Sequence, residues 1–307
     1  MSFDTIGSIV VQMKGFELFG ECHAHISMDG INYVKCMARH INGPDEAHVR
    51  ACLDAYRKQG IPFVRDGGDK YGVSKLAKSI APEYGIEYRT PIFAIYRKGG
   101  YGSIVGRAFE NMREYAALVD EAASQGADFI KIMTTGIMDF NEFGRITHFD
   151  LDAAEVREMV HIAHEQGFAV MSHTNGKTAF LTALEAGVDS IEHGNYIDQE
   201  CIIALSESAT CFVPTATVAK NLMGRGLFDE DVLARIWSAS RTVIASAIEA
   251  DCLVAIGSDA GAVGVMHAQG ALDEYDCFCE AVADEKLRDT CLKRGESFII
   301  ERFCRDS

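Results

Sequence analysis

Short apolar runs alternate with longer amphipathic stretches along nearly the whole of this 307-residue chain. Such runs are typical of buried β-strands, and helices between them predict a parallel sheet that is covered on its outside. The runs occupy residues 18–25, 61–66, 86–96, 128–133, 168–173, 190–193, 210–215 and 252–259. Eight such βα units predict a TIM-like (β/α)8 barrel, for which this length is ordinary. A doubly wound open sheet is the alternative.

The stretches between the runs carry helix signals. The segment 152–166 begins at Asp152, has Glu155 three residues later as in a capping box, and ends before Gly167. The other predicted helices cover residues 34–59 with a break at Gly43-Pro44, 74–84, 110–125, 177–186, 198–208 and 231–250, with one or two more after residue 260. The glycine-rich segment 97–107 is expected to be a mobile loop near the active site.

The charge balance excludes some partners. The chain has 29 basic and 45 acidic residues, a net charge of −16, which disfavours binding to nucleic acid and to anionic membranes. No window of eighteen apolar residues predicts a membrane span. Residues 1–15 lack the basic start of a signal peptide, so a cytoplasmic location is expected.

The ten cysteines are scattered, and none forms a CxxC pair. Many lie in apolar runs, where a free cysteine behaves as a small hydrophobic residue. Reduced, buried thiols are therefore expected, with a structural zinc site as the minor alternative.

Six side chains that can bind metal ions stand at or near the ends of the apolar runs. They are His23, His25, Lys131, His173, His193 and Asp259. The two histidines of the HAH sequence are separated by one residue, so in a strand they point to the same side. Imidazole nitrogen is a usual ligand for zinc. Each residue alone has an ordinary structural explanation, but a barrel would bring all six to one rim, whereas an open sheet would spread them apart.

Lys131 is the unusual member of this set. Inside the apolar sequence FIKIM it would point into the barrel, where burial of an ammonium group is costly. It could pair with a carboxylate, or lose its proton and react with carbon dioxide to give a carbamate that bridges two metal ions. The residue pattern alone favours the ion pair.

The motifs around these residues resemble those of the amidohydrolase superfamily, and within it the branch similar to Xaa-Arg/Xaa-Lys carboxypeptidases and Xaa-Pro dipeptidases. The matching motifs are HAH at 23–25, VRDGG at 64–68, DFIKIMTTG at 128–136, SHTNG at 172–176, SIEHG at 190–194, VPT at 213–215 and IGSDAG at 256–261. Together they span about four fifths of the chain.

The resemblance implies a site with two divalent metal ions, for which the histidines favour Zn²⁺. The more buried ion would be held by His23, His25 and Asp259, and the more exposed one by His173 and His193. A carboxylated Lys131 would bridge the two, and Asp259 would act as the proton shuttle. Arg65 or His148, near strand ends, could bind a substrate carboxylate; an ion pair or hydrogen bond at the rim is the plainer role for each.

The implied activity is hydrolysis of an amide bond in a small substrate, most simply a dipeptide or an N-acyl amino acid. A cyclic amide or lactone hydrolase, similar to imidazolonepropionase, is one alternative, and a catalytically silent barrel that binds a small molecule is another. Specificity is expected to lie in the loops 97–107, 137–148, 216–228 and 261–270.

The chain departs from the family pattern at several places. Asn175 stands where many relatives have a second histidine, and Glu21 where an aspartate is usual. About seventeen residues precede the first predicted strand and 48 follow Asp259, so we expect residues 1–307 to form one nearly bare barrel with little or no accessory β-sandwich. Residues 7–19 could form a vestigial hairpin within a β segment at 1–17. An uncovered barrel surface would suit a homo-oligomer.

Overall fold

A ring of parallel strands forms the centre of the computed structural model, which describes residues 19–148 and 150–305. The strands are β1 (Glu21–Ala24), β2 (Phe63–Asp66), β3 (Glu87–Arg89), β4 (Ala94–Arg97), β5 (Gly106–Phe109), β6 (Ile130–Met133), β7 (Val170–Thr174), β8 (Ser190–His193), β9 (Cys211–Val213) and β10 (Leu253–Val254). They pair in the orders β1-β2-β3 and β10-β9-β8-β7-β6-β4-β5, and every pairing is parallel. The predicted hairpin falls almost wholly outside the described residues, and the domain extent of 1–307 stays a prediction.

Backbone hydrogen bonds close the ring between the last strand and the first. The Cys22 N–H donates to the Ile256 carbonyl (2.9 Å), and the Asp259 N–H donates to the His23 carbonyl (2.8 Å). The predicted third strand, 86–96, is divided into β3 and β4, because Pro91 has no N–H to donate and Ile92 has φ of 68°. The eight predicted runs therefore occupy eight strand positions, and β5 is an additional strand beside β4. The closed ring confirms the predicted barrel and excludes the open sheet.

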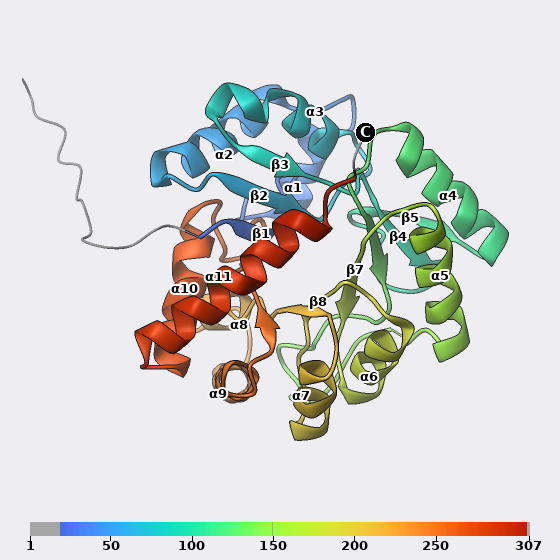
Figure 1. Cartoon of the computed structure of the whole chain (residues 1–307). Helices are drawn as coiled ribbons and strands as arrows, with labels where there is room; N and C mark the ends of the chain where they lie inside the picture. Colours follow the sequence, from blue (N-terminus) through green and yellow to red (C-terminus); the bar gives the residue numbers. More distant parts are fainter. Residues whose placement is uncertain (1–18, 149, 306–307) are drawn as a thin grey trace, which may run out of the picture.

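The helices cover the outside of this ring (Figure 1). They are α1 (Tyr33–Arg39), α2 (Glu46–Gln59), α3 (Val73–Ile80), α4 (Met112–Ser124), α5 (Ala153–Glu165), α6 (Lys177–Ala186), α7 (Gln199–Ser206), α8 (Thr217–Leu222), α9 (Glu230–Glu249), α10 (Gln269–Ala281) and α11 (Glu285–Arg302), with a 3-10 turn at Ala81–Tyr84. The Asp152 side chain accepts a hydrogen bond from the Glu155 N–H (2.9 Å), which confirms the predicted cap of α5.

Two elements lie where only loops were predicted. The strand β5 pairs with β4 and begins inside the segment 97–107. Gly106 permits this close pairing, because a Cβ there would lie 2.6 Å from the Ala94 carbonyl oxygen. The helix α8 lies inside the predicted loop 216–228. Both elements are shorter than the lengths at which hydrophobic periodicity becomes a reliable signal.

The helix α11 closes the N-terminal end of the barrel. It crosses the ring diagonally in Figure 1, and its Ile299, with Phe303 at its end, packs against Phe63 and Phe129 at the starts of β2 and β6. The opposite, C-terminal end of the barrel is left for the functional site, as in other barrels of this type.

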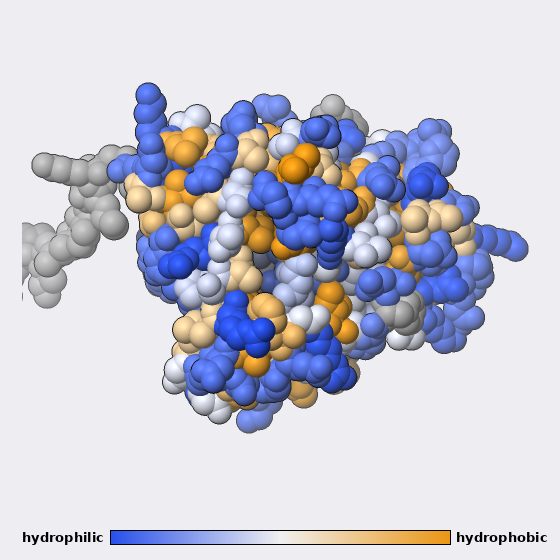
Figure 2. Space-filling model, turned by 90° about the horizontal axis from the view of Figure 1, so that it is seen from below, coloured by the Kyte–Doolittle hydropathy of each residue, from blue (hydrophilic) through white to orange (hydrophobic). Residues whose placement is uncertain are grey.

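The outer surface carries most of the charge. On the face shown in Figure 2, hydrophilic residues predominate and hydrophobic residues lie in small separate groups. Among the described residues, no helix is both long and apolar enough to cross a bilayer.

We predict that Asp189→Asn lowers the free energy of unfolding by about 1–3 kcal/mol at neutral pH. The buried Asp189 carboxylate accepts from the Val170 N–H (2.7 Å), from His164 Nε2 (2.8 Å) and from Arg302 Nε (2.5 Å), which joins α5, β7 and α11. Burial alone would raise its pKa, but the hydrogen bonds outweigh burial and lower the pKa.

A carboxylate with a lowered folded pKa stabilises the fold above its unfolded pKa of about 3.9, and this contribution is lost as the pH falls through the folded pKa. Urea unfolding should therefore show that the difference in free energy of unfolding between wild type and Asp189→Asn becomes smaller as the pH falls from neutral to acidic. The variant Asp120→Asn, at an exposed position of α4, is the control. A difference in free energy of unfolding that stays constant down to acidic pH would contradict the argument.

Candidate active site

A cavity of about 340 Å³ opens at the C-terminal ends of the strands. Five of the six predicted metal ligands line it: His25, Lys131, His173, His193 and Asp259. The sixth, His23, is fully buried directly beneath them. The barrel thus gathers side chains from β1, β6, β7, β8 and the segment after β10, although more than two hundred residues separate the first from the last.

The amine of Lys131 and the carboxylate of Asp259 both lie close to His23 of β1 and to His25, which follows β1 directly. Lys131 Nζ lies 3.3 Å from His23 Nε2 and 3.2 Å from His25 Nε2. Asp259 Oδ1 lies 3.5 Å and 3.6 Å from the same two nitrogens. No carboxylate of the described residues pairs with Lys131 within 4.0 Å, so the ion pair favoured by the residue pattern is not found.

The other two histidines complete the group. The rings of His173 and His193 are 4.5 Å apart between centroids, and those of His23 and His193 are 5.1 Å apart. His23, His193 and Asp259 each offer a ligand atom within 4.8 Å of the others. All six predicted residues therefore meet at one place.

Two of these residues reach the site through an unusual backbone conformation. His193 has φ of 73° and Asp259 has φ of 59°, in the left-handed region that costs a residue with a Cβ roughly 1–2 kcal/mol. In a regular strand Glu192 and His193 would point to opposite faces. The turn at His193 ends that alternation, so both side chains contribute to the site. Such strain is typical of functional positions.

Hydrogen bonds fix the orientation of three imidazoles. Glu192 Oε2 accepts from His23 Nδ1 (2.6 Å), Thr215 Oγ1 contacts His193 Nδ1 (2.7 Å), and the Gly136 carbonyl accepts from His173 Nε2 (3.0 Å). Partners of this kind orient metal-binding histidines and select their tautomer. The second nitrogen of each ring is then left for a metal ion.

Burial sets the protonation of the group. It lowers the pKa of His173 to about 3 and the pKa values of His23, His25 and His193 well below their usual value, so all four rings are neutral. It also lowers the pKa of Lys131 to about 8 and raises that of Asp259 to about 6. Neutral imidazoles with a carboxylate are the donors that divalent transition metals prefer.

Gly67 leaves space beside the lysine. A Cβ at this position would lie 2.5 Å from Lys131 Nζ and would collide with the His25 ring. Only glycine therefore permits the two side chains to approach β2, and the donor set fits the metal ions that the resemblance implies.

The two predicted substrate contacts have different outcomes. Arg65 has no exposed surface; it pairs with Glu192 Oε1 (2.9 Å), donates to the Cys22 carbonyl (2.6 Å) and lies outside the cavity lining. It therefore supports the partner of His23 from below and is not placed to bind a substrate carboxylate. His148 is exposed beside Tyr101, with ring centroids 6.0 Å apart, and its role stays a prediction.

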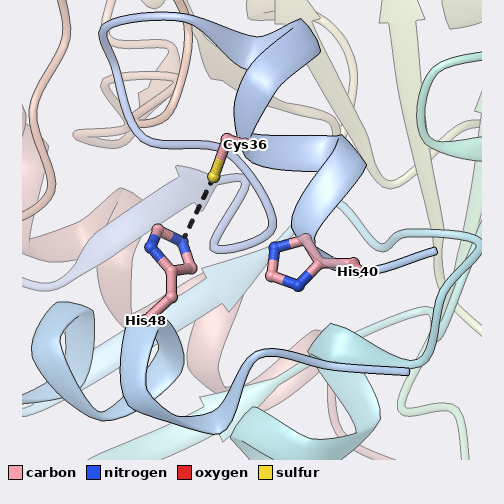
Figure 3. A group of neighbouring side chains, drawn as sticks. All are labelled: Cys36, His40 and His48. Carbon is pink, nitrogen blue, oxygen red and sulfur yellow. Dashed lines mark hydrogen bonds between the residues drawn. The ribbon is translucent and has the colours of Figure 1, made fainter. Parts of the chain in front are cut away.

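A second group of possible ligands, Cys36, His40 and His48, lies between α1 and α2 (Figure 3). The Asp45 N–H donates to His40 Nδ1 (3.0 Å), so neutral His40 carries its proton on Nε2. His48 Nε2 donates to the Ile26 carbonyl (2.8 Å) and lies 3.8 Å from the Cys36 sulfur. The nitrogens that face Cys36, His40 Nε2 and His48 Nε2, thus both carry hydrogen and are not free to bind a metal ion. The group therefore fits packed, hydrogen-bonded side chains and gives no support to the structural zinc alternative.

Several residues of the site are not among those predicted from the sequence. Glu192 carried a usable signal, since a charged residue inside an apolar strand resembles Lys131 in pattern. Tyr101, whose ring lies 5.0 Å from that of His173, gave none, because it comes from an irregular loop. Phe140 and Phe228 reach the cavity from different loops, and their rings lie 5.0 Å apart.

The sequence profile of the amidohydrolase family matches residues 21–280, which include every residue of the cluster. The chain belongs to the amidohydrolase family. Members of this family are metal-dependent hydrolases that act on C–N bonds. The match confirms the resemblance drawn from the motifs.

Two curated relatives give the scale of the similarity. Ochratoxinase of Aspergillus niger is 28% identical over 141 residues, which are 44% of this chain and 29% of the relative. An uncharacterized protein of Mycobacterium bovis is 28% identical over 162 residues, which are 50% of this chain and 42% of the relative. The chain thus spans less than half the length of the curated relatives it matches.

Solved structures confirm the barrel. A Xaa-Pro dipeptidase with methionine bound in its active site superposes with a TM-score of 0.72 at 21% identity, over 92% of this chain and 75% of that one. The ochratoxinase of A. niger gives a TM-score of 0.75 at 20% identity, over 93% and 71%. At such identities the likeness establishes the fold.

Proposed function

We propose that this chain hydrolyses an amide bond of a small substrate with two divalent metal ions, most simply Zn²⁺. The observation that carries the proposal is the meeting of four neutral histidines, one lysine and one aspartate at the floor of a single cavity. His23, His25 and Asp259 would hold one ion, and His173 and His193 the other. Bound ions of this kind polarise a carbonyl and activate water near neutral pH.

Lys131 would join the two halves of the site as a carbamate. Its amine is buried, has two imidazoles as neighbours and faces the space that Gly67 leaves. The neutral amine would attack carbon dioxide, forming the N–C bond and releasing one proton to solvent. The product is an anionic oxygen ligand, which would add a second negative charge to that of Asp259.

Asp259 would move the proton in the reaction. Its carboxylate lies at the cavity floor within 3.6 Å of His23 and His25, the residues that would hold one ion with it. It would accept the proton from that water and deliver it to the nitrogen of the leaving amine, acting first as general base and then as general acid.

The similarity to known proteins indicates which substrates to test first. A Xaa-Pro dipeptidase and an ochratoxinase share this fold, and the motifs of the chain resemble the dipeptidase branch. We therefore begin with dipeptides and N-acyl amino acids, and include lactones and cyclic amides to test the alternative.

We expect protein purified without chelator to contain close to two equivalents of metal and to hydrolyse at least one amide in this panel. Elemental analysis and detection of the released amine measure the two results. A preference for lactones would move the assignment to the ring-opening alternative. Failure to bind any metal, even with added zinc and bicarbonate, would overturn the proposal.

A further inference from the structure

We infer that the substrate is uncharged where it lies in the cavity: an amide flanked by aromatic or branched apolar groups, with no carboxylate next to the scissile bond. This inference rests on the proposed amide hydrolysis but departs from the dipeptides and N-acyl amino acids that the resemblance implies, because their free carboxylate lies next to the scissile bond. It favours uncharged derivatives of such compounds, for example their C-terminal amides. Three features of the described residues carry it: the cavity wall, the positions of the cations, and the polar groups at the floor.

The wall of the cavity is apolar on several sides. Met28 comes from the segment after β1, Tyr101 from that after β4, Phe140 from that after β6, Leu222 from α8 and Phe228 from the segment before α9. The wall includes one aromatic pair, Phe140 and Phe228, whose ring centroids are 5.0 Å apart. Such a surface binds a bulky apolar group by removing it from water.

The described lining residues include no arginine, and their one lysine is Lys131 at the floor. Arginines close in the chain to lining residues have other partners: Arg97 pairs with Glu155, Arg107 with Glu121, and Arg145 with Glu142. Arg235 lies over the Phe143 ring at 4.0 Å, and Arg225 donates to the Asn221 carbonyl (2.5 Å). Away from the floor, where Lys131 and the proposed metal ions lie, a substrate carboxylate enclosed by this wall would lose its water without gaining a cation, which is strongly unfavourable.

Neutral amide groups remain for recognition. Asn195 Nδ2 donates to Asn175 Oδ1 (2.8 Å), and Asn175 Nδ2 donates to the Gly136 carbonyl (3.0 Å). This arrangement keeps Asn195 Oδ1 available to accept a hydrogen bond from an N–H of the substrate. The net charge of −16 also favours an uncharged substrate over an anionic one, because an acidic protein disfavours the approach of anions.

The test compares two substrates of nearly the same shape, of which one is charged: an N-acyl-phenylalanine and the corresponding N-acyl-phenylalanine amide, which share the scissile acyl–nitrogen bond. With the metal-loaded enzyme, kcat/KM for the neutral compound should exceed that for the carboxylate by roughly tenfold or more. An equal or higher kcat/KM for the carboxylate would overturn the inference while leaving amide hydrolysis established.

A variant tests the reason for the preference. Val218 is a half-buried residue of α8 that lines the cavity, so Val218→Lys adds a cation to the wall. It should raise kcat/KM for the carboxylate and lower it for the neutral compound, whereas Ile203→Lys on the exposed face of α7 should change neither. Unchanged ratios in a folded Val218→Lys protein would contradict the argument.

A binding measurement tests this inference independently of the proposed function. Calorimetric titration of the metal-loaded protein with both compounds measures the preference whether or not they are hydrolysed. Tighter binding of the neutral compound without turnover would support the inference and count against the proposed hydrolysis. Tighter binding of the carboxylate would overturn the inference in either case.

Discussion

Lys131→Ala is expected to remove at least one equivalent of metal and to lower kcat/KM by roughly a thousandfold or more, about 4 kcal/mol of transition-state stabilisation. Its amine lies within 3.3 Å of His23 and His25 at the centre of the proposed site, so its loss would remove the proposed bridging anion. Elemental analysis and steady-state kinetics on protein prepared with zinc and bicarbonate measure both effects.

A matched variant separates the carbamate from a purely cationic role. Lys131→Arg keeps a positive charge but cannot form the carbamate, so it should lose metal and activity as Lys131→Ala does. Acetate or propionate added to Lys131→Ala should restore part of both, because a short carboxylate can enter the vacated space as an anionic ligand. Full activity in Lys131→Arg, or no response to any carboxylate, would indicate that the lysine acts as a cation.

The barrel and the ligand set were predictable because they depend on local patterns. Apolar runs of four to eight residues mark buried strands, and the rule that parallel strands end at one rim turns distant residues into neighbours. His23, His173 and Asp259 could therefore be assigned to one site although they lie on different βα units. The histidine pair at 23–25 also follows from strand alternation alone.

Features that depend on tertiary packing could not be predicted from the chain. The left-handed backbone at His193 places its imidazole in the site, although the alternation of a regular strand would point it to the opposite face from Glu192. No local sequence pattern predicts this turn. Arg65 lies one residue before the end of β2 and was expected to be available to a substrate, but a carboxylate on β8 holds it in the barrel interior. The apolar wall comes from segments that are far apart in the sequence, and hydrophobic periodicity does not show that they meet. The substrate class could therefore be inferred only from the three-dimensional arrangement.

Asp259→Asn should lower kcat for amide substrates by roughly 10²- to 10⁴-fold, with a smaller change in KM, because it removes the proposed proton shuttle and keeps a side chain of nearly the same shape. Metal content should fall less than in Lys131→Ala, since the carboxamide retains an oxygen ligand.

The informative comparison is between an amide and the 4-nitrophenyl ester of the same acyl group. An amine leaves only after its nitrogen is protonated, whereas 4-nitrophenolate leaves without a proton, so a missing proton donor should harm the amide far more than the ester. Ester hydrolysis by Asp259→Asn should therefore retain a much larger fraction of wild-type kcat than amide hydrolysis does. Equal losses for the two substrates, at equal metal content, would restrict Asp259 to holding the metal or activating water, because both roles serve the two substrates alike.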